Sequence, residues 1–202
     1  MRIWSIQSRE AWEYLERHGE LMAKRHHCSD SWPQAYDWMK AQLTRRIGPP
    51  PLENTEPLWG WYQWNNERQK RPDLRSVRHN WSPPGPYVML ECELPVHEVL
   101  LSDFGAWHFP LNDWHLALQE QEDERFSQAL DHAYHRKDRA KLEILQREKE
   151  KSWEVIFDLQ ALDHEDWKLI PEKEIQACFW QIKVDKVKSV TKFTSRQSKT
   201  WT

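Results

Sequence analysis

Glycine is scarce in this chain, with 5 among 202 residues, and this scarcity excludes a large group of nucleotide sites. The loops that cradle phosphates, GxGxxG and GxxxxGK[ST], need several glycines close together, and neither pattern occurs, nor does the GxSxG of serine hydrolases. Cysteine is also sparse, because Cys28, Cys92 and Cys178 are the only three and stand at scattered spacings. We therefore expect no disulfide scaffold and a reducing, cytoplasmic location.

Long apolar runs are missing too. The N-terminus turns polar after 1–7, so it lacks the apolar stretch of about 7–15 residues that a secretory signal needs. No window approaches the roughly 20 apolar residues that span a bilayer. The net charge of −3 gives no overall attraction to nucleic acid or to anionic lipid. We expect no membrane partner, and a nucleic-acid partner only through a local basic patch.

Tryptophan, in contrast, is abundant, with 14 residues. Most simply these are core anchors, each burying on the order of 200 Å². The alternative is a surface on which bases, a nicotinamide or adenine ring, or a sugar would stack. The tryptophans in predicted helices are read as packing: Trp12, Trp32, Trp38, Trp114 and Trp153. Those in predicted strands are the candidates for function: Trp4, Trp59, Trp61, Trp64 and Trp180.

Hydrophobic periodicity predicts an α+β protein with a single domain over 1–202. Strands are expected at 2–7, 58–64, 88–94, 98–101, 175–183 and 186–193, forming a small mixed or antiparallel β core. Two N-terminal helices are expected, the first between Ser8 and Gly19 and the second from Ser31 to Ile47, with Trp32 in its buried stripe. The tail at 194–202 is expected to be disordered.

A charged helical insert is predicted at 112–157, interrupted around 135–139. Asn112 is expected to cap it, and Trp114, Leu118 and Tyr134 are placed in its buried stripe. The charged residues between them predict either a solvated helical hairpin or a surface for a protein partner.

Two stretches are locally basic. The predicted loop at 65–86 follows the rings of Trp61, Tyr62 and Trp64 and carries five basic and two acidic side chains, including Arg71, Arg78 and Asp73. Such a loop would hold a phosphate while the rings stack on a base, or else is a solvated loop in which Arg71 and Asp73 pair. Lysines that alternate along 183–199 protect a sheet edge or touch nucleic acid.

No metal site is predicted. His26, His27 and Cys28 are adjacent in sequence, so they cannot easily all point at one ion, and no second pair follows at ligand spacing.

Five blocks, at 3–7, 59–64, 71–74, 90–103 and 175–180, together resemble a bacterial family catalogued as domain of unknown function 3841. The late strand Gln176-Ala177-Cys178-Phe179 also resembles the ADP-ribosyltransferase-like fold, with Cys178 where the catalytic Glu of that fold would stand. The second resemblance implies a cleft for NAD. Its ligand-binding residues would be Trp4, Gln7, Trp61, Tyr62, Arg71, Asp73, Asp103 and Gln176.

Catalysis is left unassigned, because a neutral thiol cannot stabilise an oxocarbenium-like transition state electrostatically. Either the chemistry has moved to Gln176, Glu91 or Asp103, or the cleft only binds its ligand. The first hypothesis is a domain that binds a nucleotide, with NAD as the cofactor. The alternative is a non-catalytic module that contacts a protein through 112–157 or nucleic acid through the basic C-terminal stretch. A hydrolase using Asp103 with His108 rests on proximity in sequence alone.

Overall fold

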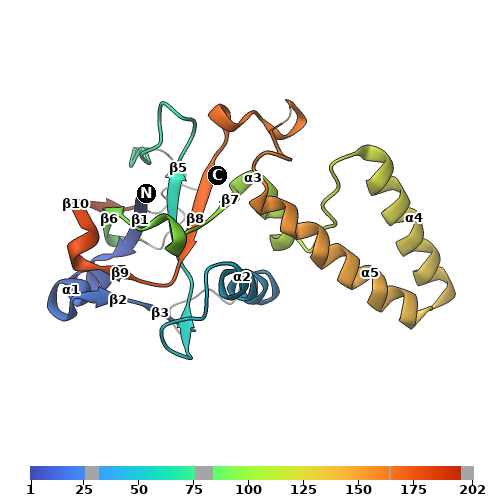
Figure 1. The fold of residues 1–202 in the computed structure, drawn as a ribbon, viewed down its shortest axis with the longest axis horizontal. Helices are drawn as coiled ribbons and strands as arrows, with labels where there is room; N and C mark the ends of the chain where they lie inside the picture. The colour runs from blue at the N-terminus through green and yellow to red at the C-terminus, as the bar shows by residue number, and fades with distance from the viewer. Residues whose placement is uncertain (26–31, 76–83, 164, 197–202) are drawn as a thin grey trace. The chain divides into compact units, whose positions relative to one another are not determined.

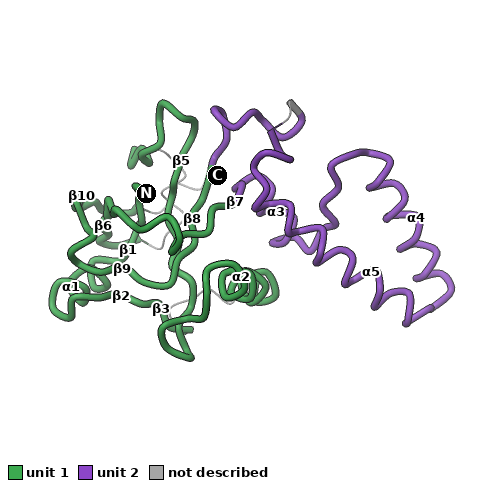
Figure 2. The backbone as a smooth tube through the Cα atoms, in the orientation of Figure 1, with its two compact units in different colours: residues 1–101, 175–202 green, residues 102–174 purple. Residues whose placement is uncertain are grey.

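In a computed structural model of the chain, residues 1–25, 32–75, 84–163 and 165–196 are described. The predictions made for His26, His27, Cys28, Ser31 and Arg78, and for 197–202 of the tail expected at 194–202, lie outside the described residues. Thr194 and Ser195 form the end of a strand, β10 (Val187–Ser195). The chain divides into two compact units (Figure 2): unit 1 is 1–101 with 175–202, and unit 2 is 102–174. The predicted α+β class is confirmed. That 1–202 forms a single domain stays a prediction.

Unit 1 is built on the main sheet, whose strand order is β10-β6-β1-β5-β8-β7 (Figure 1). The pairings β10–β6, β6–β1, β1–β5 and β5–β8 are all antiparallel. The strands are β1 (Arg2–Ser8), β5 (Leu58–Gln63), β6 (Gly85–Glu93), β7 (Leu100–Asp103), β8 (Ile175–Phe179) and β10 (Val187–Ser195). Two small strand pairs accompany them, β2 (Glu20–Leu21) with β9 (Ile182–Lys183) and β3 (Ala23–Lys24) with β4 (Thr55–Glu56).

The helices of unit 1 begin and end where local chemistry predicts. In α1 (Arg9–His18) the hydroxyl of Ser8 accepts a hydrogen bond from the Ala11 backbone N–H at 3.1 Å, and Gly19 ends the helix with φ 81°. The second helix, α2 (Pro33–Arg46), has proline in its first turn, where no N–H is needed. Trp32 precedes it and is 46% exposed, so its predicted burial is wrong. An indole at the helix entrance lies outside the buried stripe of α2, which consists of Ala35, Met39, Gln42 and Leu43.

One face of the main sheet packs on α1 and carries the hydrophobic core. Residues opposite one another in register point to the same face, so the core side chains can be followed from strand to strand. The buried members on the sheet are Ile3, Leu58, Val88, Leu90, Cys92, Ala177 and Phe179. Gly60 belongs to this face, because a Cβ there would lie 2.6 Å from Ile3 Cγ2. Met89 points to the opposite face of β6 and is still only 2% exposed. Alternation of apolar and polar residues predicts a strand with one buried face, but β6 is buried on both faces at this point.

Unit 2 is mainly helical, with α3 (Phe104–Leu111), α4 (Glu120–Arg136) and α5 (Arg139–Ser152). The chain reverses between α4 and α5 at Lys137, whose φ is 57°, and a small core of Phe126, Ala133 and Leu145 joins the two helices. Short 3-10 turns follow at Trp153–Phe157, Glu165–Trp167 and Ile170–Glu172. No helix within the described part of the chain is both long and apolar enough to cross a membrane.

The predicted cap and three of the predicted buried positions in this segment are wrong. Asn112 ends α3 and does not begin a helix. Trp114 and Tyr134 are 58% and 63% exposed, and Leu118 is 40% exposed, so the predicted buried stripe does not include them. Trp114 and Leu118 lie in the non-helical chain between α3 and α4, where helical periodicity does not apply. Tyr134 directly follows Ala133, and neighbouring residues of a helix point in different directions, so Ala133 reaches the small core and Tyr134 does not.

Candidate functional site

A row of four side chains crosses the main sheet on the face opposite the core. Trp4 of β1 pairs with Trp61 of β5 and with Glu91 of β6, and Trp61 pairs with Gln176 of β8. Because paired residues share a face, Glu91, Trp4, Trp61 and Gln176 all point to the same side. We call these four residues the tryptophan row. With strands about 4.8 Å apart, the Cα atoms of Trp4 and Gln176 are separated by roughly 10 Å.

Two members of the row are deeply buried, and each has an unpaired hydrogen-bond donor. Trp4 is 7% exposed and Gln176 is 5% exposed. Trp4 Nε1 and Gln176 Nε2 are shielded from water and have no hydrogen-bond partner among the described residues. A buried donor left unpaired costs about 1–3 kcal/mol, so native proteins contain few of them. Two such donors in one row mark this face as a candidate site.

The row borders an open pocket with a volume of about 450 Å³. The pocket is lined by Met1, Arg2, Trp4, Tyr62, Lys70 and Val96. Lys70 Nζ lies 5.0 Å from the centroid of the Tyr62 ring, in cation–π geometry. Pockets that hold small ligands commonly measure about 300–1,000 Å³ and combine rings with a few polar groups, as this one does.

The charges around the row are arranged by short contacts. Glu91 binds Arg2, with Oε1 at 3.2 Å from Arg2 Nε, and accepts a hydrogen bond from the Ser189 hydroxyl at 3.1 Å. Arg71 is exposed and donates through Nη2 to Thr191 Oγ1 at 3.0 Å. Thr191 pairs with Met89, and Met89 pairs with Ile6, two residues along β1 from Trp4. Arg71 is therefore held on the same face as the tryptophan row.

Four of the predicted ligand-binding residues are thus associated with one side of the sheet: Trp4, Trp61 and Gln176 lie in the row, and Arg71 binds β10 on the same face. A fifth, Tyr62, packs against the hydrophobic core and also lines the pocket with Trp4. Sequence reasoning assigned no role to Arg2, and it grouped Lys70 only with the basic loop. Which of these side chains meet depends on strand register, and no local sequence signal reports register.

Two other predicted residues of unit 1 are used elsewhere. Gln7 lies on the opposite face of β1 from Trp4, and its Nε2 donates to Ser5 Oγ at 2.8 Å. Asp73 accepts hydrogen bonds from the Arg75 side chain at 3.1 Å and from the Arg75 backbone N–H at 2.9 Å. Arg71 reaches Thr191, so the two basic residues of this turn have different partners.

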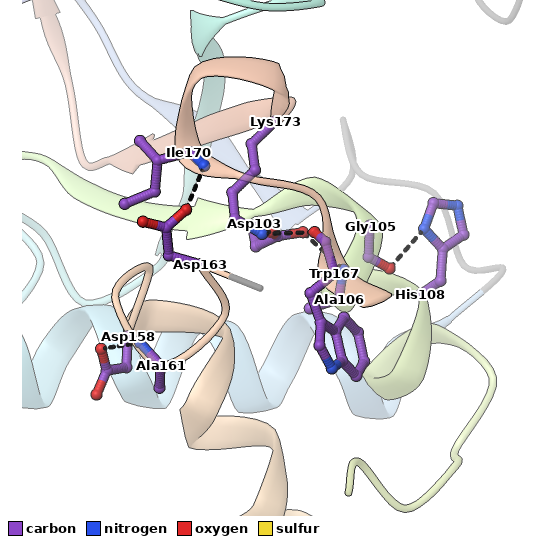
Figure 3. A network of polar contacts seen from close by, with 10 residues as sticks. All are labelled: Asp103, Gly105, Ala106, His108, Asp158, Ala161, Asp163, Trp167, Ile170 and Lys173. Atoms are coloured by element: carbon purple, nitrogen blue, oxygen red, sulfur yellow. Dashed lines mark hydrogen bonds and ion pairs between the residues drawn. The ribbon is translucent and has the colours of Figure 1, made fainter. Parts of the chain in front are cut away.

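Asp103 belongs to unit 2, where both of its carboxylate oxygens are engaged (Figure 3). Oδ1 accepts the Ala106 backbone N–H at 2.9 Å and caps α3, and Oδ2 accepts Lys173 Nζ at 2.7 Å. Lys173 is 1% exposed and also donates to the Trp167 carbonyl at 2.6 Å. His108 Nδ1 instead lies 3.0 Å from the Phe104 carbonyl. The contacts of Asp103 are those of a structural cap and ion pair.

Cys178, which stands where the related fold has its catalytic glutamate, is fully buried on β8. It pairs with Trp59 and lies on the face of the tryptophan row, two residues from Gln176. Burial raises the pKa of the Cys178 thiol well above its usual value, so the group is neutral near pH 7. Within 1–25, 32–75, 84–163 and 165–196, no three His, Cys, Asp or Glu side chains gather as a metal site would require.

A family model described as a domain of unknown function (DUF3841) matches residues 2–188, and the chain belongs to this family. The resemblance drawn from the five sequence blocks is thereby confirmed. No curated protein and no solved structure matches the chain.

Proposed function

We propose that unit 1 binds a nucleotide on the face of the tryptophan row, with NAD as the first ligand to test. The observation that carries this proposal is the presence of two buried, unpaired donors in one cross-strand row, beside a pocket lined by rings and cations. A nucleotide has the matching parts: a flat ring with hydrogen-bonding groups on its edge, and phosphates.

The rings of the pocket supply the stacking surface. Trp4 and Tyr62 both line it, and aromatic side chains that stack on a base contribute about 1–3 kcal/mol per base. Trp61 is half-buried in the row and packs edge to face on Trp64, with ring centroids 4.6 Å apart. This contact helps to hold the Trp61 ring in place.

Cations around the pocket suit the phosphates. Lys70 and Arg2 line the pocket, and Arg71 is exposed on the same face of the sheet. Charge-assisted hydrogen bonds to phosphate are roughly twice as strong as neutral ones, so these three side chains would anchor the charged part of the ligand.

The proposed role is binding without a transferase reaction. The thiol of Cys178 is neutral and buried, and the Glu91 carboxylate is held by Arg2 and Ser189. The neutral thiol carries no negative charge, and the charge of the Glu91 carboxylate is already paired with Arg2. Neither group can therefore stabilise an oxocarbenium-like transition state.

Titration of the purified protein with NAD, followed by tryptophan fluorescence and calorimetry, tests the proposal. We expect saturable quenching in the wild type. The matched variants are Lys70→Ala, which removes a cation from the pocket, and Lys192→Ala, which removes an exposed cation from β10, where its partner Val88 belongs to the core face. Lys70→Ala should weaken binding about tenfold, equivalent to about 1.4 kcal/mol, and Lys192→Ala should leave it unchanged.

The proposal fails if millimolar NAD produces neither quenching nor heat, and if AMP and ADP-ribose also fail to bind. Equal losses in Lys70→Ala and Lys192→Ala would show that binding is diffuse and does not use the pocket.

The alternative function, a protein-interaction module in unit 2, has one specific observation in its favour. Trp114 and Tyr134 present 58% and 63% of their surfaces to solvent, and aromatic residues of this kind are common centres of protein interfaces. Sedimentation of the full chain with and without Trp114→Ala tests whether the exposed Trp114 mediates self-association. A purely monomeric protein at all concentrations would count against self-association.

A further inference from the structure

We infer that the tryptophan row recognises a ligand ring that carries a carbonyl oxygen, an inference that rests on the proposed nucleotide-binding function. The candidate rings are a nicotinamide, through its carboxamide oxygen, and an oxopurine. The juxtaposition that carries the inference is Trp4 Nε1 with Gln176 Nε2, two donors on one face of the sheet with the ring of Trp61 between them in the row.

Trp4 differs from other buried indoles of the chain in this respect. Trp180, equally buried at 7% exposure, donates from Nε1 to the Gly48 carbonyl at 3.0 Å. Trp153, which is completely buried, donates to the Trp114 carbonyl at 2.7 Å. The fold thus supplies acceptors to buried indoles, and Trp4 has none among the described residues.

The chemistry of the two groups determines whether the missing partner is a hydrogen-bond donor or an acceptor. An indole N–H only donates, and the Nε2 of a glutamine carries two further donor hydrogens. The group that satisfies both must therefore present acceptors. Because both nitrogens are buried and neutral, a neutral carbonyl suits them better than a phosphate, whose charge would be costly to remove from water.

The charges around the row agree with a ligand whose neutral carbonyl is buried and whose phosphate stays near water. Arg71 is exposed and Lys70 is half-buried at the pocket, so the side chains that favour phosphate have access to water. Trp4 contributes to both regions, because it lines the pocket and its Nε1 is shielded from water. A ligand that binds Nε1 changes the surroundings of this indole, so binding should change the tryptophan fluorescence.

Three mononucleotides test the inference, since all carry one phosphate. The oxopurine nucleotide IMP presents two adjacent acceptors on its N7 and O6 edge, whereas AMP presents one acceptor and one amino donor. Nicotinamide mononucleotide supplies the carboxamide oxygen. We expect IMP, nicotinamide mononucleotide or both to bind at least tenfold more tightly than AMP in fluorescence titrations of the full chain.

The variants Trp4→Phe and Gln176→Met each remove a donor and keep an apolar side chain of similar shape. Each should lower the affinity for the preferred nucleotide about tenfold and change the affinity for AMP less than about threefold. The matched control is Trp180→Phe, which should leave the ratio of affinities unchanged. Circular dichroism confirms folding, and the two donor variants serve as independent tests should one of them fail to fold.

Each outcome supports or overturns the inference. A gain for nicotinamide mononucleotide alone assigns the carbonyl to a carboxamide, and a gain for IMP alone assigns it to an oxopurine. If AMP binds as tightly as both others, or if Trp4→Phe and Gln176→Met keep the full preference, the inference is wrong while nucleotide binding stands. If none of the nucleotides binds, both the inference and the proposed function fall.

Discussion

Trp4→Phe should cost clearly less stability than Trp180→Phe, although the two indoles are equally buried, each 7% exposed. Both tryptophans lie in unit 1, and both substitutions delete the same atoms. The loss of buried apolar surface is therefore similar in the two variants, and the difference between them isolates the indole N–H.

The size of the difference follows from the hydrogen-bond partners. Trp180→Phe removes a 3.0 Å bond to the Gly48 carbonyl, a net loss of about 1 kcal/mol, and leaves that carbonyl without its donor. Trp4→Phe removes a donor that has no partner among the described residues, which relieves a desolvation cost of about 1–3 kcal/mol. Trp180→Phe should therefore be less stable than Trp4→Phe by about 2–4 kcal/mol.

Urea unfolding followed by far-UV circular dichroism measures this difference without relying on the deleted fluorophores. Equal m values in the two variants would show that a shift in midpoint reports stability alone. In thermal melts, a difference of about 2 kcal/mol should separate the two Tm values by roughly 4–8 °C for a chain of this size. If Trp4→Phe loses as much stability as Trp180→Phe, Trp4 Nε1 has an acceptor in the folded protein and the reasoning is refuted.

Three further predictions concern the stability of the folded chain. Gly60→Ala should lower the free energy of unfolding, measured in urea, by about 1–3 kcal/mol, because the new Cβ would lie 2.6 Å from Ile3 Cγ2. If the variant is as stable as the wild type, Ile3 moves aside without cost and this prediction is wrong. Asp103→Asn should cost about 3–5 kcal/mol, because it leaves the Lys173 ammonium buried without its charge partner, and adding Lys173→Met should recover much of the loss; a double variant no better than the single one would contradict this. Burial, helped by Glu91, raises the pKa of Cys92 from 9.0 to about 12, so the thiol binds its proton more tightly in the folded state and stability should fall as pH rises from about 9 to 12. Urea midpoints measured across this range should fall less steeply in Cys92→Val, and parallel slopes would argue against the shift.

The first strand and helix were predictable because their signals are local. Ser8 and Gly19 bound α1 through a side-chain cap and a positive φ, which depend on neighbouring residues alone. The alternation of Val88, Leu90 and Cys92 identified β6 for the same reason.

The helix α3 was missed because Gly105 and Pro110 both disfavour helix in isolation. Tertiary packing overrides that preference here: Ala106 is fully buried, Trp107 is 3% exposed, and Asp103 caps the first turn. The spacing of Asp103 from Ala106 was the available signal, since an aspartate three residues before a helical N–H is a common cap.

The candidate site was only partly predictable. Alternation along β1 already places Gln7 on the opposite face from Trp4, so the sequence itself argued against grouping them. That Trp4, Trp61 and Gln176 form one row depends on the order β1-β5-β8 and on register, which long-range pairing determines. Sequence similarity to a family groups such residues without saying which face they share.

The unpaired donors connect stability with function. Two of them together cost about 2–6 kcal/mol, a large share of the 5–15 kcal/mol that typically holds a domain folded. Nonpolar substitutes of similar size exist for both residues, so packing alone does not explain why an indole N–H and a carboxamide occupy these two positions. A ligand that accepts both hydrogen bonds would offset the cost and, by linkage, stabilise the folded chain in proportion to its concentration. The difference between Trp4 and Trp180, identical in type and burial and opposite in hydrogen bonding, is therefore the strongest structural argument for a binding site on this face.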